Sequence, residues 1–397
     1  MTDNPFAILT DEAVPESRVD IDDVLLAGRA RVRRRRGVVA GVCTALVVLV
    51  TLAGVAAAVR PPHGPPADPS PAPSPAPSVS VHPTGCTPTA LNVGGEIGAA
   101  STDPSGHYLA LTRGPDPGLL VVYRDGAEVR RYTAAQRIRV TAMNASGVIV
   151  GVEALDERAF RITPDGTRLL LAKPTGAVSV TPKGVNAAGD IVGEATMPGK
   201  RFRAVLWRHT APDTPLLLAT PAGKSSAAED ITDDGRVIGH LNQGEQPYQW
   251  NPDGTTATLA TPPGLPGGYP QRIAGDWVIG MVNFLVLKSF DPATGRRTGE
   301  GPVKPARWQL STGKVEFLEA TDVFAGGGSI AADGTAVINR FTDAAFWNGT
   351  TLLPLPRPSS YDRLQISSMT ADGRLLIGWA AQSAGGRSDL FRWDCRR

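Results

Sequence analysis

The stretch GVNAAGDIVGEATMPGKRFRAVLWRHTAPDTPLLLATPAG, residues 184–223, is one complete copy of a repeat that decides the fold. It starts as a short apolar strand, turns through polar residues that end at Gly189, and returns as a second strand. A third strand ends at Trp207, and a Leu-containing fourth strand follows the next turn. Alternation of apolar and polar residues over four to six positions is typical of strands. The unit therefore predicts four short antiparallel strands.

The first hairpin of this unit recurs along the chain, for example in VTAMNASGVIVGVEA, AEDITDDGRVIGHLN and SSMTADGRLLIGWAA. Its turn ends in a glycine, which permits the positive φ that a tight hairpin requires. These glycines are Gly106, Gly147, Gly189, Gly235, Gly275, Gly334 and Gly373. Their spacing is 39 to 46 residues, except for 59 residues after Gly275. A period near 42 with four strands per unit predicts an all-β propeller of seven blades, or six if the irregular fifth unit merges with its neighbour.

The third strand of each unit carries a large side chain at one fixed position before the second turn. These residues are Tyr123, Ile162, Trp207, Trp250, Trp308, Trp347 and Trp393. The position holds five of the seven tryptophans in the chain. Such a ring could stack on carbohydrate, but packing of each large ring against the next blade is the simpler interpretation, and we expect it.

The last seven residues, FRWDCRR, end without a fourth strand, whereas GCTPTALNV, from residue 85, resembles a fourth strand that lacks its own unit. We therefore expect the N-terminal segment to supply the outer strand of the last blade. Cys86 and Cys395 would then meet where other units have a covalent turn. A disulfide would close a loop of about 310 residues, for which chain entropy predicts a gain of roughly 4 to 5 kcal/mol. The alternative is two free or differently paired thiols.

The unit at residues 184–223 resembles the extracellular repeats of the HAF type, which run as a GINxxGxVVG hairpin followed by an AFLW strand. The matching residues are Val185, Asn186, Gly189, Val192, Gly193, Ala204, Leu206 and Trp207. AFRITPDGTRLLLA and AAFWNGTTLLPL match the second half of that repeat. The resemblance implies a surface or secreted β-propeller and brings no catalytic motif with it. The layout of the whole chain also resembles single-pass actinobacterial membrane proteins with an outer propeller-like domain.

The N-terminal part predicts a membrane anchor. Residues 37–59 form an uncharged run of 23 residues, which as a helix is long enough to cross a hydrocarbon core of roughly 30 Å. Before it lie an acidic tail, which we expect to be mostly disordered, and an arginine cluster that includes the membrane-flanking Arg33, Arg34, Arg35 and Arg36. Arginines stay on the cytoplasmic side, so the tail, residues 1–36, is predicted to be cytoplasmic. Everything after Arg60 is then predicted to be extracellular.

The segment from 60 to 85 is a proline-rich linker, with ten prolines between residues 61 and 85. It should adopt extended polyproline II and hold the domain at residues 86–397 away from the bilayer. Cys43 falls inside the apolar run, while Cys86 and Cys395 fall in a predicted oxidising compartment, where thiols tend to pair.

The sequence offers no recognised catalytic site. The histidines have no ligand partner at metal-binding spacing, and HExxH, GxSxG and Walker patterns are absent. The innermost strands read AAS, VTAMN, GVN, EDIT, QRIA, GGSI and SSMT, which we interpret as small or apolar. We therefore expect a filled and chemically quiet channel, no cofactor, no metal and no enzymatic activity. Charge is nearly balanced, 40 basic against 38 acidic residues, which argues against nucleic acid as a partner.

One insertion departs from the repeat, SFDPATGRRTGEGPVK at residues 289–304. With Lys288 it gathers Arg296, Arg297 and Lys304 on a loop. Loops on a rigid scaffold often carry binding sites, so these four residues form a candidate anion-binding loop. A solvated insertion without a ligand is the alternative.

The sequence thus predicts a single-pass membrane protein whose propeller binds an extracellular protein or cell-wall ligand. A regulator whose cytoplasmic tail binds a sigma factor or another cytoplasmic protein is the second hypothesis, although the tail is short for such a domain. A propeller hydrolase or lyase is the least favoured.

Overall fold

The computed structural model describes residues 85–91, 93, 97–113, 118–134, 137–153, 158–199, 201–283, 290–291, 296–297, 303–319, 323–383 and 388–396. The predicted cytoplasmic tail, its arginines 33 to 36, the predicted membrane helix and all but the last residue of the predicted linker lie outside these ranges. Within the ranges, no helix has the length and hydrophobicity needed to cross a bilayer.

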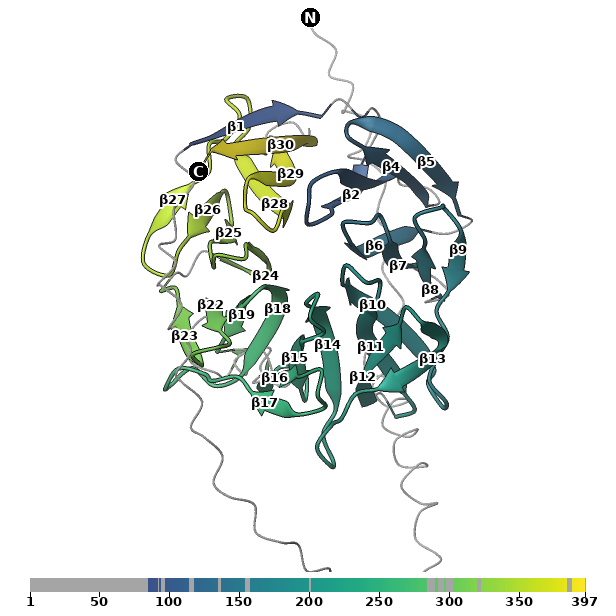
Figure 1. Cartoon of the computed structure of the whole chain (residues 1–397). Coiled ribbons are helices and arrows are strands. Elements are labelled where there is room, and N and C mark those ends of the chain that lie inside the picture. The colour runs from purple at the N-terminus through teal and green to yellow at the C-terminus, as the bar shows by residue number, and fades with distance from the viewer. Residues whose placement is uncertain are drawn as a thin grey trace, which may run out of the picture. The chain divides into compact units, whose positions relative to one another are not determined.

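The described residues form seven four-stranded antiparallel sheets, so the prediction of seven blades is confirmed. Figure 1 shows these sheets arranged around a central axis. Blade I consists of β2 (Ile97–Thr102), β3 (Tyr108–Arg113), β4 (Leu119–Arg124) and β5 (Ala127–Thr133). Blade II consists of β6 (Ile138–Met143), β7 (Ile149–Glu153), β8 (Arg158–Ile162) and β9 (Arg168–Leu170). Blade III consists of β10 (Ser179–Val185), β11 (Ile191–Met197), β12 (Arg201–Arg208) and β13 (Ala211–Leu217).

The next three blades repeat this order. Blade IV consists of β14 (Ser226–Ile231), β15 (Val237–Leu241), β16 (Gln246–Trp250) and β17 (Thr256–Thr258). Blade V consists of β18 (Gly268–Ala274), β19 (Trp277–Val282), β22 (Lys304–Gln309) and β23 (Lys314–Phe317). Its insertion contains a separate two-stranded pair, β20 (Phe290–Asp291) and β21 (Arg296–Arg297). Blade VI consists of β24 (Val323–Ile330), β25 (Ala336–Arg340), β26 (Ala344–Trp347) and β27 (Leu352–Pro354).

Blade VII is completed by the other end of the chain. Its strands are β28 (Arg363–Met369), β29 (Leu375–Ala381), β30 (Ser388–Arg396) and β1 (Gly85–Ala90). β1 pairs with β30 in a register that sets Cys86 opposite Cys395, and the two sulfurs form a disulfide across 309 residues of sequence. The predicted clasp is therefore confirmed, and Figure 1 shows β1 and β30 side by side at the rim.

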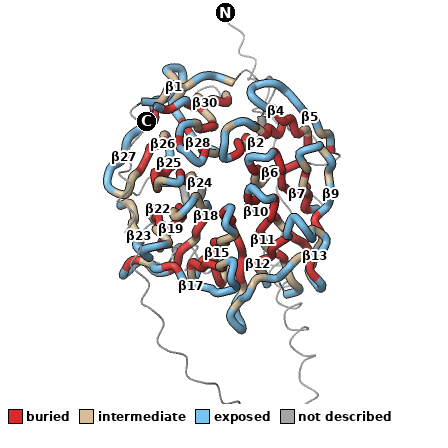
Figure 2. Tube along the Cα trace, viewed as in Figure 1, coloured by how far each residue is buried: buried red, intermediate tan, exposed pale blue. Residues whose placement is uncertain are grey.

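The turn glycines behave as predicted. All seven have positive φ, from 57° at Gly275 to 89° at Gly189. Each lies between the first strand of a blade, next to the axis, and the second strand. The second and third strands carry most of the buried residues, whereas the outer strands are largely exposed (Figure 2).

The large residues of the third strand are core residues, as expected, because six of the seven are at most 3% exposed and Tyr123 is half-buried. Their direction differs from the prediction. Trp207, in blade III, donates its indole N–H to the carbonyl of Ala172, at the end of blade II, at 2.7 Å. Trp250 and Trp308 make the equivalent bond to their preceding blades. The rings thus pack against the preceding blade and not the next one.

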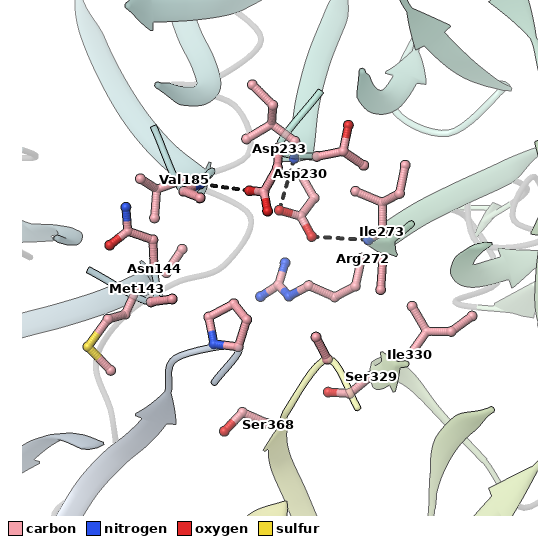
Figure 3. A pocket seen from close by; sticks show the side chains of 18 of the residues that line it. Met143, Asn144, Val185, Asp230, Asp233, Arg272, Ile273, Ser329, Ile330 and Ser368 are labelled. Atoms are coloured by element: carbon pink, nitrogen blue, oxygen red, sulfur yellow. Dashed lines mark hydrogen bonds between the residues drawn. The ribbon is translucent and has the colours of Figure 1, made fainter. Parts of the chain in front are cut away.

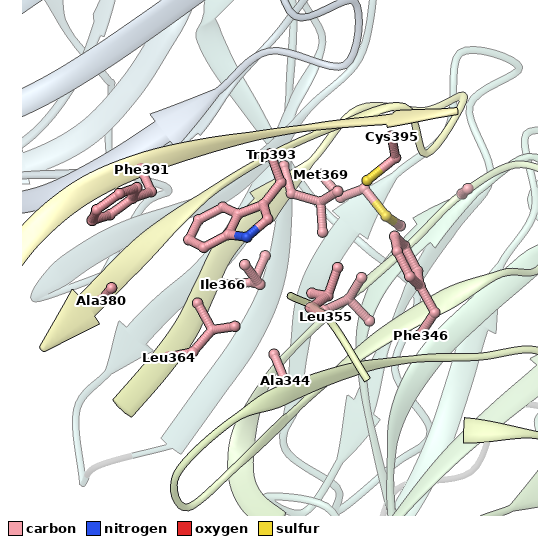
Figure 4. Close-up of a cluster of buried hydrophobic side chains, with 13 residues drawn as sticks. Ala344, Phe346, Leu355, Leu364, Ile366, Met369, Ala380, Phe391, Trp393 and Cys395 are labelled. Atoms are coloured by element: carbon pink, nitrogen blue, oxygen red, sulfur yellow. The ribbon is translucent and has the colours of Figure 1, made fainter. Parts of the chain in front are cut away.

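The packing around Trp393 shows what this achieves (Figure 4). Its ring lies with Leu364 and Ile366 of its own blade and with Leu355 and Phe346 of blade VI in one buried cluster. Trp393 also donates its indole N–H to the carbonyl of Pro356 at 2.9 Å. Trp207, Trp250, Trp308 and Trp393 therefore each fill an inter-blade space and satisfy their only polar atom, as buried Trp normally does.

Candidate functional site

The inner strands are not regular. In blades II, III, IV, V and VII, the pairing of the first strand with the second skips one residue, which marks a β-bulge. The skipped residues are Thr141, Lys183, Glu229, Gln271 and Ser367. A bulge breaks the alternation of a strand and redirects its side chains. In blades II and VII, the skipped residue and the residue after it consequently both line the channel, namely Thr141 with Ala142 and Ser367 with Ser368.

One cavity of about 540 Å³ lies where these inner strands end and their turns begin. We define the channel ring as a set of seven residues, one from each inner strand. They occupy equivalent places, because each pairs with the equivalent residue of the second strand of its blade. The ring members, from blade I to blade VII, are Ser101, Ala142, Gly184, Asp230, Arg272, Ser329 and Ser368. The residue that follows the ring residue in sequence is apolar in six of the blades. All six of these residues line the cavity, namely Met143, Val185, Ile231, Ile273, Ile330 and Met369. The volume lies within the range of small-molecule sites.

The prediction of a filled and quiet channel is wrong. The cavity is open, and blades III, IV and V contribute Lys183, Asp230 and Arg272 to its wall. The stretches EDIT and QRIA already contained charged residues. We misjudged them because regular alternation does not say which residues of a bulged strand face the axis.

Asp230 is the anion at the centre of the charged wall (Figure 3). Its Oδ1 accepts a hydrogen bond from the N–H of Ile231 at 2.9 Å, and its Oδ2 accepts one from the N–H of Ile273 in blade V at 3.1 Å. Burial raises the pKa of this carboxyl, although the nearby charge of Arg272 and these two bonds act in the opposite direction. A Cβ on Gly184 would stand 2.5 Å from Oδ1 of Asp230, so the glycine makes room for this carboxylate.

A second layer of ionisable groups lies behind Lys183. The carboxylate of Glu229 lies 3.6 Å from the Lys183 ammonium, and the Glu194 carboxylate lies 3.9 Å from it. Tyr269 donates its hydroxyl proton to Glu229 at 2.8 Å, and the Nε2 of His240 lies 3.4 Å from the same oxygen. The N–H of Gly244 donates to Nδ1 of His240, which assigns the proton of a neutral imidazole to Nε2.

The pKa values of this layer follow from burial and pairing. Burial alone would raise the pKa of Glu229, but the hydrogen bond from His240 and the charge of Lys183 outweigh it and lower that pKa. Burial raises the pKa of Glu194, and it raises the pKa of the Tyr269 hydroxyl with help from Glu229. The layer therefore fixes Lys183 from behind and does not itself line the cavity.

The hairpin turn of blade IV adds further charged groups to the cavity lining. Asp233 accepts a hydrogen bond on Oδ1 from the N–H of Ala187 at 2.7 Å. Arg236 is held by three partners, because it bonds to Asp234 at 3.0 Å and to the carbonyl of Gly275 at 3.1 Å, and lies 3.6 Å from Asp276. Opposite this blade, Ser329 and Ser368 present hydroxyl groups, and Figure 3 shows both facing the same space.

The candidate anion-binding loop is described only in part. Arg296 and Arg297 form β21 and pair with Asp291 and Phe290, while Lys288 lies outside the described residues. Lys304 opens β22 and is already paired, since its ammonium lies 2.5 Å from the Glu319 carboxylate and 5.4 Å from the centre of the Phe317 ring. The joint role of the four residues stays a prediction.

Sequence reasoning missed Lys183, Asp230 and Arg272 as site residues. The available signal was positional, because each lies two or three residues before the first residue of the hairpin turn, where other units carry Ser, Thr, Ala or Gly. Among the described residues, no group of three or more His, Cys, Asp or Glu side chains is placed to hold a metal ion.

Comparison with known proteins establishes the fold only. No protein-family model matches the chain, so the resemblance to HAF-type repeats stays a prediction, and no curated protein matches it. The solved structures that resemble it are β-propellers. They include the propeller domain of the trilobed protease from Pyrococcus furiosus, with 13% identity, a TM-score of 0.52 and coverage of 75% of this chain and 95% of that one. An oligogalacturonate lyase in complex with manganese has 9% identity, a TM-score of 0.52 and coverage of 78% and 93%. Virginiamycin B lyase from Staphylococcus aureus has 13% identity, a TM-score of 0.50 and coverage of 78% and 98%.

Proposed function

We propose that this protein is a single-pass membrane protein whose extracellular propeller binds a ligand at the cell surface without transforming it. The observation that carries the binding role is the cavity of about 540 Å³ at the ends of the inner strands. It combines charged, hydroxyl-bearing and apolar side chains within one closed ring, which is the composition of a small-molecule site.

The disulfide supports the extracellular location. A Cys86–Cys395 bond persists in oxidising compartments and is rare in the cytosol. It agrees with the sequence-based expectation that the chain crosses a membrane at residues 37–59 before the propeller begins. Peptide mapping of exported protein under non-reducing conditions should recover these two cysteines in one linked fragment, and free thiols at both would contradict this placement.

The arrangement of the ionisable groups favours binding over catalysis. The buried pair Glu229 and His240 lies behind Lys183 and is absent from the cavity lining. Asp230 has both oxygens engaged by backbone N–H groups. A general acid or base must come within hydrogen-bond reach of the substrate, and these groups are instead bonded within the protein.

The cavity can be tested by filling it. In Ala142→Trp, an indole on the channel ring would occupy space that a ligand needs, so the full-length protein should bind solubilised cell-envelope fragments at least tenfold more weakly. Ala127→Trp, on the exposed strand β5, is the matched control and should bind normally. Equal binding by both variants would remove the cavity from the proposal.

The same assay tests the predicted anion-binding loop. If β21 adds a second contact to an anionic wall polymer, Arg296→Ser combined with Arg297→Ser should weaken binding and flatten its dependence on salt. Unchanged affinity and unchanged salt dependence would leave this loop as a solvated insertion.

A further inference from the structure

We infer that the central cavity recognises a small zwitterion of the amino-acid or short-peptide class, with Arg272 taking its carboxylate and Asp233 its ammonium group. This inference rests on the proposed binding role and names the ligand class of that same cavity.

The charged groups that line the cavity are balanced, so the wall as a whole favours neither an anion nor a cation. The cavity is lined by three cationic side chains, Lys183, Arg236 and Arg272, and by three anionic ones, Asp230, Asp233 and Asp234. A purely anionic or purely cationic ligand would therefore gain little from the wall as a whole. A ligand with one charge of each sign meets attraction at both ends if the available cation and anion are separate.

Arg272 is the available cation. Within the described residues its one hydrogen bond runs from Nη1 to the carbonyl of Gln271, at 2.9 Å, and no carboxylate lies within 4.0 Å of its guanidinium. Asp230, its neighbour on the channel ring, is already satisfied by two backbone N–H groups. Figure 3 shows the Arg272 side chain extending into the cavity below Asp230 and Asp233. A guanidinium with free donors is suited to bidentate binding of a carboxylate.

The other two cations are occupied. Lys183 stands between Glu229 and Glu194, at 3.6 and 3.9 Å. Arg236 is bound by Asp234, Asp276 and the carbonyl of Gly275. Neither offers a free charge comparable with that of Arg272.

Asp233 is the available anion. Its Oδ1 accepts the N–H of Ala187 at 2.7 Å, and no cation lies within 4.0 Å of its carboxylate among the described residues. Asp234, the next residue, is instead bonded to Thr232 and Arg236. Asp233 and Arg272 project from adjacent blades and make no ion pair with each other, so a ligand can lie between them.

The remaining wall fits the middle of a peptide. The hydroxyl of Ser329 can donate to and accept from an amide group. The Ser368 hydroxyl accepts the N–H of Thr102 at 3.1 Å and can still donate its own proton to an amide carbonyl. Met143, Ile273 and Ile330 supply apolar surface for a small side chain. A neutral sugar would use the hydroxyls but would leave the opposite charges of Arg272 and Asp233 unpaired.

The test uses one ligand in three forms. Full-length protein in detergent micelles is titrated calorimetrically with L-alanyl-L-alanine, its N-acetyl derivative and its C-terminal amide. We expect the zwitterion to bind, and we expect each derivative, which has lost one charge, to bind about tenfold more weakly, as the loss of a charge-assisted hydrogen bond predicts.

Variants then assign each end. Arg272→Gln should bind the zwitterion about tenfold more weakly and should bind the free acid and the amide with equal affinity. Asp233→Asn should abolish the difference between the free amine and the acetylated form. Arg131→Gln, which alters an exposed arginine on β5, is the control and should retain both differences.

Two results would overturn the inference. One is equal affinity of the unaltered protein for all three forms. The other is an Arg272→Gln variant that still distinguishes the free acid from the amide as strongly as the unaltered protein does. The dipeptide could fail to bind while envelope fragments still bind in a manner sensitive to Ala142→Trp. In that case the inferred ligand class is wrong and the proposed binding role of the cavity is retained. If neither binds, both proposals fall.

Discussion

At the scale of single residues, two kinds of glycine shape each blade for different reasons. The turn glycines are required by their positive φ. The glycine of the second strand, as in IVG and VIG, is required by close approach. A Cβ at Gly151, Gly193, Gly239, Gly280 or Gly378 would stand 2.0 to 2.4 Å from a carbonyl oxygen of the bulged inner strand. The bulge thus brings the inner backbone against its neighbour, and only glycine fits beneath it.

Replacement of one such glycine should destabilise the ring. In Gly378→Ala the added methyl would meet the carbonyl of Gln365 at 2.2 Å, so we expect a loss of about 1 to 3 kcal/mol in the free energy of unfolding. Denaturant unfolding measures it. Gly85→Ala, whose Cβ meets nothing within 4 Å, should be neutral, and equal stability of the two variants would contradict the close-approach argument.

The asparagines of the repeat also have a structural role that their sequence alone did not reveal. Asn144 donates its side-chain N–H to the carbonyl of Asn186 at 2.8 Å, and Asn186 donates in the same way to the carbonyl of Thr232 at 3.3 Å. These two asparagines therefore join the hairpin turns of blades II, III and IV.

At the scale of elements, the strands and turns were predictable from sequence, whereas the channel was not. Turn glycines and alternating residues depend on local geometry, so they located the first hairpin of all seven blades. The direction of the tryptophans and the exposure of Asp230 and Arg272 depend on contacts between blades and on the bulge. No pattern within a single unit carries that information.

The interface between blades V and VI shows how much can depend on one such contact. Arg307, on β22, is 5% exposed and lies over the rings of Trp277 and Trp347, at 4.5 and 5.5 Å from their centres. It donates to the Glu316 carboxylate at 2.6 Å and to the carbonyls of Gly334 and Asn348. One planar guanidinium thus bonds to groups of both blades.

A lysine at position 307 should not reproduce the contacts of Arg307. Arg307→Lys keeps the charge but loses the planar group that stacks on two rings and donates in three directions, so we expect the free energy of unfolding to fall by about 2 to 3 kcal/mol. Thermal or denaturant unfolding gives the difference. Arg131→Lys, in an exposed pair with Glu128, serves as the reference and should change stability little. A fall no larger than that of the reference would show that the contact adds nothing.

At the scale of the whole molecule, the two ends of the propeller are joined twice, by the β1–β30 ladder and by the Cys86–Cys395 disulfide. The repeat count and the unpaired last unit predicted both features from sequence. That prediction succeeded because the last unit has three strands and the N-terminal segment has one extra strand, so every blade is complete only if the two ends share a blade.

Removal of the disulfide should loosen the ring without opening it. In Cys86→Ser combined with Cys395→Ser, the unfolded chain regains the entropy of a loop of 309 residues. We expect a loss of up to about 5 kcal/mol in the free energy of unfolding. Comparison with the unaltered protein in the presence and absence of reductant measures it, because the variant should be insensitive to reductant. A variant as stable as the oxidised protein would show that the clasp contributes nothing.

The position of β1 has a consequence for biogenesis. It is the first strand of the propeller to be synthesised, yet its partner, β30, is the last. Until β30 has been synthesised, β1 has no partner and blade VII has only the strands β28 and β29 in place. Truncation of the chain before β30 would leave β1 without its partner, and exposed strand edges of this kind promote aggregation. Closure of the ring therefore depends on synthesis that continues through β30, because only then can β1 and β30 pair.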